Sequence, residues 1–287
     1  MNAALKVVVK TLAVSGLILP ATIVAASFAK RVGSNSVSAS TSSLSDSARA
    51  VNETSVPVIV ELFTSEGCSS CPPADALLVK LEREQPIRGA EVVALEEHVD
   101  YWNDLGWADP FSSAEFTERQ QRYAQAFRRG GSYTPQMVVD GQVEFVGSRP
   151  DEARENIAAA ATRPRAEVSV ARGAGNADGR GGWSVNVRGL TAGSDDTAEV
   201  WVAVTETRLH SNVERGENSG RDLGHAAVVR QLTRLGVADG RKQEAFSGST
   251  HIDLRPEWKK ENLRVVAFVQ EKNSRHILGA GSRKVAE

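Results

Sequence analysis

The chain has 287 residues, of which 41% are hydrophobic and 24% are charged, and its formal net charge is −2. This composition fits a globular protein large enough for two cores. Because 34 Lys and Arg residues nearly balance 36 Asp and Glu residues and no dense basic run occurs, the sequence gives no support for a nucleic-acid partner.

Residues 1–29 have the pattern of an export signal. Lys6 and Lys10 form a positive segment, and the stretch 11–28 that follows is apolar apart from small or hydroxyl residues. This stretch is long for a cleaved signal, so an anchor in the inner membrane stays open as the alternative. Residues 30–55 are rich in Ser and predict a linker, and we expect a periplasmic or secreted protein.

Residues 56–95 predict a β-α-β unit. The segment 56–63 is apolar and β-branched except for Glu61, which is typical of a strand buried in a parallel sheet. Two prolines and apolar residues at helical spacing then predict a helix over 72–84. A second short strand is expected at 91–95, and the connection between the two strands is a crossover.

Four more elements are expected before residue 162. A capping pattern at Ser112 predicts the start of a helix that runs to about Arg128. Asp140-Gly141 lies between two apolar runs and indicates a tight hairpin. An alanine-rich helix is expected to follow over 148–161. The predicted order of elements over residues 56–162 is therefore β-α-β-α-β-β-α.

Residues 163–287 predict a second, β-rich domain. The sequence there alternates short β-branched runs with Gly-rich turns, and the segment 226–235 reads as its one helix. Strands are expected at 168–171, 183–187, 200–205, 251–254, 263–269 and 277–279. The expected fold class is α/β, with the C-terminal strands forming a domain of their own.

The only two cysteines, Cys68 and Cys71, lie between the first strand and the first helix. Open α/β sheets place their active sites at this end of a strand, and a helix N-terminus lowers the pKa of a thiol. A bridge that closes so short a loop contributes only about 2 kcal/mol to stability, so a redox pair is favoured over an inert disulfide. We expect Cys68 to be the exposed, attacking thiolate and Cys71 to resolve the mixed disulfide.

This order of elements, with Cys-x-x-Cys after the first strand and Pro135 before the hairpin, resembles the thioredoxin superfamily. The resemblance implies that the Thr134-Pro135 bond is cis and lies against the cysteines. The stretches 61–68, 98–102 and 133–136 more narrowly resemble a family of exported bacterial thioredoxin-like proteins catalogued as a domain of unknown function. The resemblance covers residues 56–285 and carries no established substrate.

Further side chains are candidates for the chemistry of such a site. Pro135 has no N–H, so with Thr134 it is expected to border an edge that binds an extended substrate segment, unless it merely starts a strand. Glu61 is expected either to accept the proton of Cys71 or to be salt-bridged. The last group follows the second strand and is expected to form a substrate-binding wall: His98, Tyr101 and Trp102.

The predicted function is an exported thiol–disulfide oxidoreductase that acts on protein or small-molecule thiols, with a redox-recycling partner and no cofactor. A non-catalytic binding module with a closed disulfide is one alternative. The other is a copper or zinc chaperone that uses Cys68, Cys71 and His98, although these supply only three ligands and no metal site is assigned.

The remaining histidines are expected at the surface or as caps: His210, His225, His251 and His276. The loop with Glu217 and Asn218 is expected to be solvated, with contact to the redox site as the alternative.

Overall fold

The computed structural model describes residues 55–173, 182–190 and 196–286, which belong to one compact unit. The predicted export signal and residues 30–54 of the predicted linker lie outside the described residues. Within the described part of the chain, no helix is both long and apolar enough to cross a membrane.

The N-terminal half of the described chain has the predicted order of elements, with a short 3-10 helix added. Its elements are β1 (Val56–Thr64), α1 (Pro72–Glu84), β2 (Ala90–His98), η1 (Asn103–Leu105), α2 (Ala114–Ala126), β3 (Gln136–Val139), β4 (Val143–Val146) and α3 (Pro150–Ala161). The helix α1 begins at Pro72 because proline fits the first helical turn, where its missing N–H has no partner to lose. The helix α2 begins one residue later than predicted, since Ser113 and not Ser112 is its cap and accepts a hydrogen bond from Glu115 N at 3.2 Å.

The C-terminal half consists of strands and one 3-10 helix. Its elements are β5 (Glu167–Arg172), β6 (Gly182–Arg188), β7 (Ala198–Glu206), β8 (Leu209–Asn212), β9 (Asp222–His225), β10 (Val228–Ala238), β11 (Glu244–His251), η2 (Lys260–Asn262), β12 (Leu263–Glu271) and β13 (Ile277–Lys284). The segment predicted as a helix at 226–235 is instead the strand β10, and the strand predicted at 251–254 lies earlier, as β11. The sequence did not predict β8 or β9.

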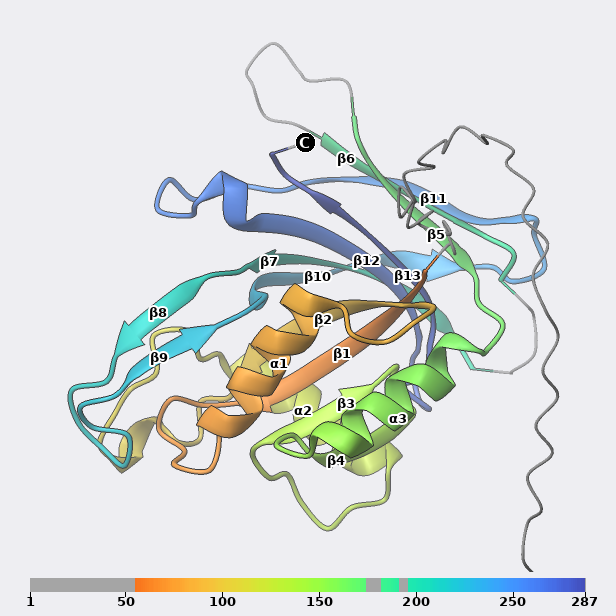
Figure 1. The fold of residues 1–287 in the computed structure, drawn as a ribbon. Coiled ribbons are helices and arrows are strands. Elements are labelled where there is room, and N and C mark those ends of the chain that lie inside the picture. The colour runs from red at the N-terminus through yellow and green to blue at the C-terminus, as the bar shows by residue number, and fades with distance from the viewer. Residues whose placement is uncertain (1–54, 174–181, 191–195, 287) are drawn as a thin grey trace, which may run out of the picture. The chain divides into compact units, whose positions relative to one another are not determined.

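One eight-stranded mixed sheet joins the two halves, in the order β13-β12-β7-β10-β2-β1-β3-β4 (Figure 1). β1 and β2 are parallel, and β10 joins β2 in parallel through the pair Val228 and Glu96. The expected boundary at residues 162 and 163 therefore does not divide the sheet, because the C-terminal strands extend it. A helix at 226–235 would leave the edges of β2 and β7 unpaired, and β10 pairs with both.

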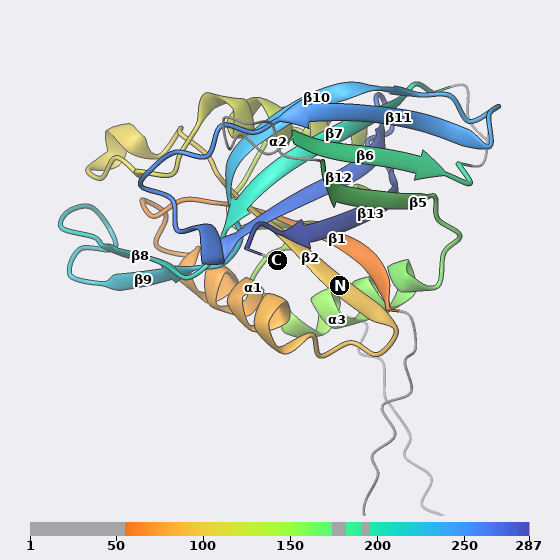
Figure 2. The ribbon, with the colours of Figure 1, turned by 90° about the horizontal axis from the view of Figure 1, so that it is seen from above.

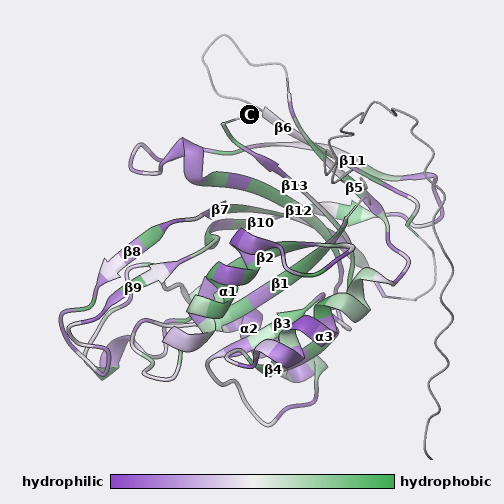
Figure 3. Cartoon of the chain, viewed as in Figure 1, coloured by the Kyte–Doolittle hydropathy of each residue, from purple (hydrophilic) through white to green (hydrophobic). Residues whose placement is uncertain are grey.

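The three-stranded sheet β11-β6-β5 packs against the C-terminal half of the large sheet (Figure 2). The core between them includes Val185 and Val187 of β6 and Val200 and Val265 of the large sheet. A second core lies under α1 and α3. The hydrophobic residues are concentrated along the central strands (Figure 3). The sandwich of strands and the helix-covered part thus share one sheet.

Successive side chains of β1 point to opposite faces of the sheet, so only every second one faces α1. Leu62 of β1 is in the same core as Ala74 and Leu78 of α1, whereas Glu61 points to the opposite face of the sheet. The β3–β4 hairpin turns at Asp140 and Gly141, whose φ angles are 48° and 65°, as the Asp-Gly pair predicts. The carboxyl end of β1 and the start of α1 are therefore fixed on one face of the sheet.

Candidate functional site

Cys68 and Cys71 form a disulfide in the loop between β1 and α1, with their Cα atoms 5.4 Å apart. Cys71 is the N-cap residue of α1, and its carbonyl accepts hydrogen bonds from Ala74 N at 2.8 Å and Asp75 N at 3.2 Å. The Sγ atom of Cys68 lies 3.3 Å from Ser70 Oγ. The pair thus lies at the positive end of the helix dipole, as the sequence predicts.

Neither cysteine is accessible to solvent in this form of the protein. Cys68 and Cys71 are each 0% exposed, whereas Ser69 and Ser70 between them are exposed. The expectation that Cys68 presents an open sulfur is therefore wrong for the disulfide form. A substrate reaches the pair only after a local movement of the surrounding chain.

The loop between β8 and β9 is hydrogen-bonded to the disulfide loop. The amide of Asn218 donates to Cys68 O at 3.0 Å and to Glu66 O at 2.8 Å. Ser69 N donates to the carboxylate of Glu217 at 3.2 Å. The contact that the sequence left as an alternative to a solvated loop is confirmed, and it joins residues about 150 positions apart in the chain.

Pro135 lies close to the first turn of α1. The Thr134-Pro135 bond is cis, which confirms the expectation from the resemblance. Gly147 lies between Pro135 and Ala74 of α1: a Cβ atom added at Gly147 would be 3.1 Å from Ala74 Cβ and 3.4 Å from Pro135 Cβ. The carbonyl of Pro135 accepts a hydrogen bond from Gly147 N at 2.9 Å. One lone pair of this carbonyl is thus used within the protein.

Trp102 links the disulfide loop to Thr134. Its indole N–H donates to Thr134 Oγ1 at 2.9 Å, and a Cβ atom added at Gly67 would lie 3.1 Å from Trp102 Cβ. Tyr101 is 41% exposed and donates to Gln120 Oε1 at 3.2 Å. The structure therefore brings Trp102 and Thr134 together beside the cysteine loop, and Tyr101, which precedes Trp102 in the chain, is open to solvent.

Glu61 lies on the face of the sheet opposite α1. The Arg119 guanidinium is 2.6 Å from its carboxylate, and the hydroxyl of Tyr123 also donates to it. Glu61 is therefore not placed to accept the proton of Cys71, and its predicted role as a proton acceptor is wrong. The alternative, a salt-bridged buried glutamate, is confirmed.

Asp75 of α1 is a buried carboxyl group on the cysteine side of the sheet. It lies four residues after Cys71, which places the two side chains on one helix face. Thr64 Oγ1 donates to Asp75 Oδ1 at 2.6 Å, while Oδ2 has no hydrogen-bond partner among the described residues. Burial, followed by the nearby charge of Glu96, raises the pKa of Asp75 to about 7. The sequence signal that was missed is the spacing of four from the second cysteine.

A buried cluster of histidines and carboxylates lies next to Asp75. His98 is 0% exposed, with Nδ1 2.7 Å from Asp109 Oδ2, so it does not form the predicted substrate-binding wall. His225 of β9, expected at the surface, is 2% exposed and lies between two glutamates: its Nδ1 is 2.9 Å from Glu96 Oε1 and its Nε2 is 3.1 Å from Glu66 Oε1. Of the other histidines, His210 and His251 are exposed and His276 is half-buried.

The charges of the cluster determine its titration. Burial by itself lowers the pKa of His98, but the charge and hydrogen bond of Asp109, together with the charge of Glu96, outweigh burial and raise the pKa. Burial also opposes protonation of His225, and the glutamates beside it raise its pKa well above the usual range. Burial would raise the pKa of Asp109, yet His98 and backbone N–H groups lower it, so Asp109 is ionised.

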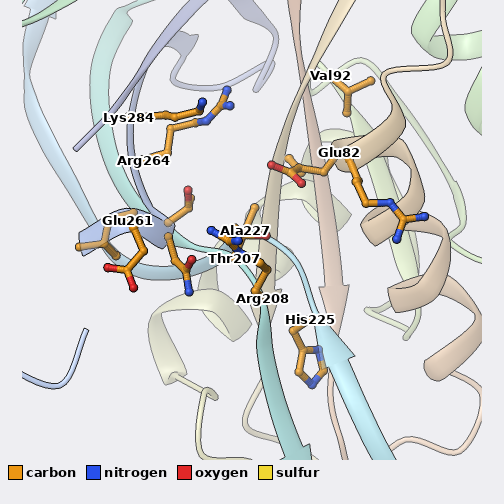
Figure 4. A pocket seen from close by; sticks show the side chains of 14 residues that line it. Glu82, Val92, Thr207, Arg208, His225, Ala227, Glu261, Arg264 and Lys284 are labelled. Atoms are coloured by element: carbon orange, nitrogen blue, oxygen red, sulfur yellow. The ribbon is translucent and has the colours of Figure 1, made fainter. Parts of the chain in front are cut away.

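A cavity of about 470 Å³ opens beside this cluster (Figure 4). It is bordered by α1, β2 and the C-terminal strands, and His225 is one of its lining residues. Its walls also carry cationic side chains: Arg83, Arg208, Arg264 and Lys284. The cavity gives a path from solvent toward the buried histidine.

These features define a mixed α/β protein with one large sheet and a Cys-x-x-Cys disulfide at the start of its first helix. The chain belongs to the family described as "Protein of unknown function (DUF1223)", whose match covers residues 59–270. The expected relation to a domain of unknown function is thereby confirmed.

Solved structures similar to this chain include two that cover about four fifths of it. A crystal structure of a protein from Agrobacterium tumefaciens has 27% sequence identity and a TM-score of 0.60, covering 79% of this chain and 94% of that one. The structure of HBP35 of Porphyromonas gingivalis has 16% identity and a TM-score of 0.55, covering 81% of this chain and 76% of that one. At this identity the similarity concerns the fold only. A comparison with curated proteins gives no match.

Proposed function

We propose that this protein is an exported thiol–disulfide oxidoreductase in which residues 56–162 have a thioredoxin-like fold. The strand order β2-β1-β3-β4, with β1 and β2 parallel and an antiparallel β3–β4 hairpin, supports that fold. The observation that carries the function is the Cys68–Cys71 disulfide at the start of α1, with Asp75 one turn further along the same helix.

The proposed reaction is dithiol–disulfide exchange. In the reduced protein, the Cys68 thiolate attacks one sulfur of a substrate disulfide, forming a mixed disulfide and releasing the first substrate thiolate. Asp75 accepts the proton of Cys71, whose thiolate then attacks Cys68 Sγ and releases the second substrate thiolate. Two electrons pass from the cysteine pair to the substrate, and the reverse sequence oxidises a substrate dithiol. A pKa of about 7 lets Asp75 take or give this proton near neutral pH.

A trapping experiment tests the cysteine chemistry. The reduced Cys71→Ser variant, incubated with oxidised glutathione, is expected to gain one glutathione on Cys68, because the resolving thiol is missing. The wild-type protein should instead return to the internal disulfide, and the double variant lacking both cysteines should gain nothing. Mass spectrometry of the intact protein measures each product. Absence of the adduct on Cys71→Ser, with no reduction of glutathione disulfide by the wild type, would reject the proposal.

The loop between β8 and β9 is proposed to limit access to the disulfide. Asn218→Ala removes two hydrogen bonds to the cysteine loop and is expected to speed reduction by dithiothreitol. Ser219→Ala is the matched control, because the Ser219 side chain donates to Glu214 O within its own loop. Stopped reactions alkylated with iodoacetamide give the rates. Equal rates for both variants would show that this loop does not limit access.

A non-catalytic binding module is the second candidate, and the complete burial of both sulfurs favours it. In that case the native disulfide should resist dithiothreitol for as long as the protein stays folded, and Cys68→Ser should leave partner binding unchanged. A chaperone that binds metal through Cys68, Cys71 and His98 is not favoured, because the two sulfurs are bonded to each other and are not thiolates.

Export is part of the proposal. Disulfides persist in oxidising compartments, so the closed Cys68–Cys71 bond supports a periplasmic or secreted location, with residues 1–29 as the signal or anchor. Protease treatment of intact and of osmotically shocked cells tests the location. Resistance of the protein to the protease in both intact and shocked cells would indicate the cytoplasm and contradict export.

A further inference from the structure

Glu96, His98 and His225 bring three ligand atoms within 4.8 Å of one another in the buried cluster. We propose that these residues form a binding site for a divalent transition-metal ion, with zinc as the best-matched class. Glu96 and His98 lie on the same side of β2, and β9 supplies His225. The site is separate from the cysteine chemistry, because none of its three ligands is a sulfur.

The orientation of His98 is that of a metal ligand. Its Nδ1 lies 2.7 Å from Asp109 Oδ2, and since an ionised carboxylate only accepts, Nδ1 carries the proton. In the neutral form of His98, which a metal ion requires, the lone pair is then on Nε2, which lies 3.8 Å from Glu96 Oε1. Nε2 is buried and has no hydrogen-bond partner among the described residues. A carboxylate behind a histidine ligand is the usual outer arrangement of protein metal sites.

The arrangement is repeated at His225. Its Nε2 lies 3.1 Å from Glu66 Oε1, and its Nδ1 lies 2.9 Å from Glu96 Oε1. Glu66 is itself held, because Trp107 Nε1 donates to its other oxygen at 2.7 Å. When Nε2 of neutral His225 donates its proton to Glu66, the lone pair is on Nδ1, next to the same Glu96 oxygen that His98 Nε2 approaches. Each imidazole therefore has an anchored carboxylate on its outer nitrogen.

The distances and the charge suit one small dication. In tetrahedral zinc sites, bonds of about 2.0 Å place ligand atoms about 3.3 Å apart. The separations of 2.9 and 3.8 Å around Glu96 Oε1 lie on either side of this value. Three carboxylates surround two imidazoles, so a dication offsets buried negative charge that neutral imidazoles leave. Two nitrogens and one oxygen are a set that zinc prefers, and a fourth position stays open for water or a ligand.

The cavity beside β2 supplies an entry path. His225, one of the three ligands, lines this cavity of about 470 Å³ (Figure 4), so the site borders a space that is open to solvent. The competing arrangement is an imidazolium at His225 that donates to Glu66 and Glu96 without any metal. That arrangement leaves His98 Nε2 without a partner, whereas a metal ion engages it.

Metal titration of the full chain tests the site. The protein is stripped with EDTA and titrated with Zn²⁺ by calorimetry and with Co²⁺ by visible absorption. We expect one ion per chain, with Co²⁺ bands typical of four or five nitrogen and oxygen ligands. A stoichiometry well below one, or Co²⁺ bands of the hexaaqua ion only, would overturn the proposal and leave the imidazolium arrangement.

Variants separate the site from adventitious binding. His98→Gln and Glu96→Gln are expected to weaken Zn²⁺ at least 100-fold, and Asp109→Asn, which keeps the ligands, about 10- to 100-fold. His210→Gln, at an exposed histidine beside Asp222, is the matched control and should leave affinity unchanged. Equal loss in the control, or none in the ligand variants, would refute the site.

Two further measurements keep the test decisive. If a ligand variant fails to fold, Zn²⁺ should still raise the melting temperature of the wild type, and by less that of Asp109→Asn at the same Zn²⁺ concentration. The same titration on the double variant of Cys68 and Cys71 should be unchanged. Loss of binding only in that variant would show that the cysteines hold the metal, which would reject this site and point to the chaperone.

Discussion

Replacement of Asp75 by asparagine tests whether a buried carboxyl group keeps its proton near neutral pH. Burial and the charge of Glu96 raise the pKa of Asp75 from 3.8 to about 7 in the folded protein. The folded protein therefore binds this proton more tightly than the unfolded chain does. The stability linked to Asp75 is complete below about pH 4 and is lost as the pH rises to about 7.

The size of the effect follows from the two pKa values. The difference between 3.8 and about 7, at about 1.4 kcal/mol for each pH unit, corresponds to about 4 kcal/mol of lost stability at pH 8. Asparagine has the same shape and no charge, and its side-chain oxygen can still accept from Thr64. We expect Asp75→Asn to be more stable than the wild type at pH 8, by at most about 4 kcal/mol, and to lose this advantage toward pH 4.

Urea unfolding followed by tryptophan fluorescence measures the effect at pH 5, 6, 7 and 8, with EDTA present throughout. The difference between variant and wild type should grow steadily over this range. Asp151→Asn, at an exposed position on α3, is the control and should show a constant, small difference. An Asp75→Asn difference that does not change with pH, or that favours the wild type more at pH 8, would refute the assigned protonation.

Two further substitutions test the packing behind the site. Arg119→Ala leaves the buried carboxylate of Glu61 without a cation and should lower the free energy of unfolding, measured in urea, by about 3–5 kcal/mol. Arg122→Ala, at a half-exposed position on the same helix, is the control and should change it by less than about 0.5 kcal/mol. Similar losses in both variants would contradict the role of the ion pair. Gly141→Ala should lower the melting temperature, because φ is 65° and the new Cβ would lie 1.9 Å from a backbone oxygen, while Gly130→Ala has open space around it. An equal shift in both glycine variants would show that the hairpin turn is not the cause.

Local patterns in the sequence predicted most of residues 56–161. The prolines and apolar spacing after Cys71 predicted α1, and Asp140-Gly141 predicted the hairpin, because each pattern describes contacts within a few residues. The cysteine pair was placed at the start of α1 for the same reason. The burial of its sulfurs was not predicted, since the loop that contacts it lies about 150 positions away in the chain.

Tertiary structure decided the rest. The segment 226–235 has apolar residues that fit a helix or a strand, and it becomes β10 because it pairs with β2 and β7. Alternation along β1 places Glu61 on the far face and turns Thr64 toward Asp75 on the cysteine side. His225 lies 129 positions from Glu96, and only the folded sheet brings them within 2.9 Å. The chain therefore encodes its helices, turns and cysteine pair locally, whereas its buried charges meet through long-range strand pairing that no local period specifies.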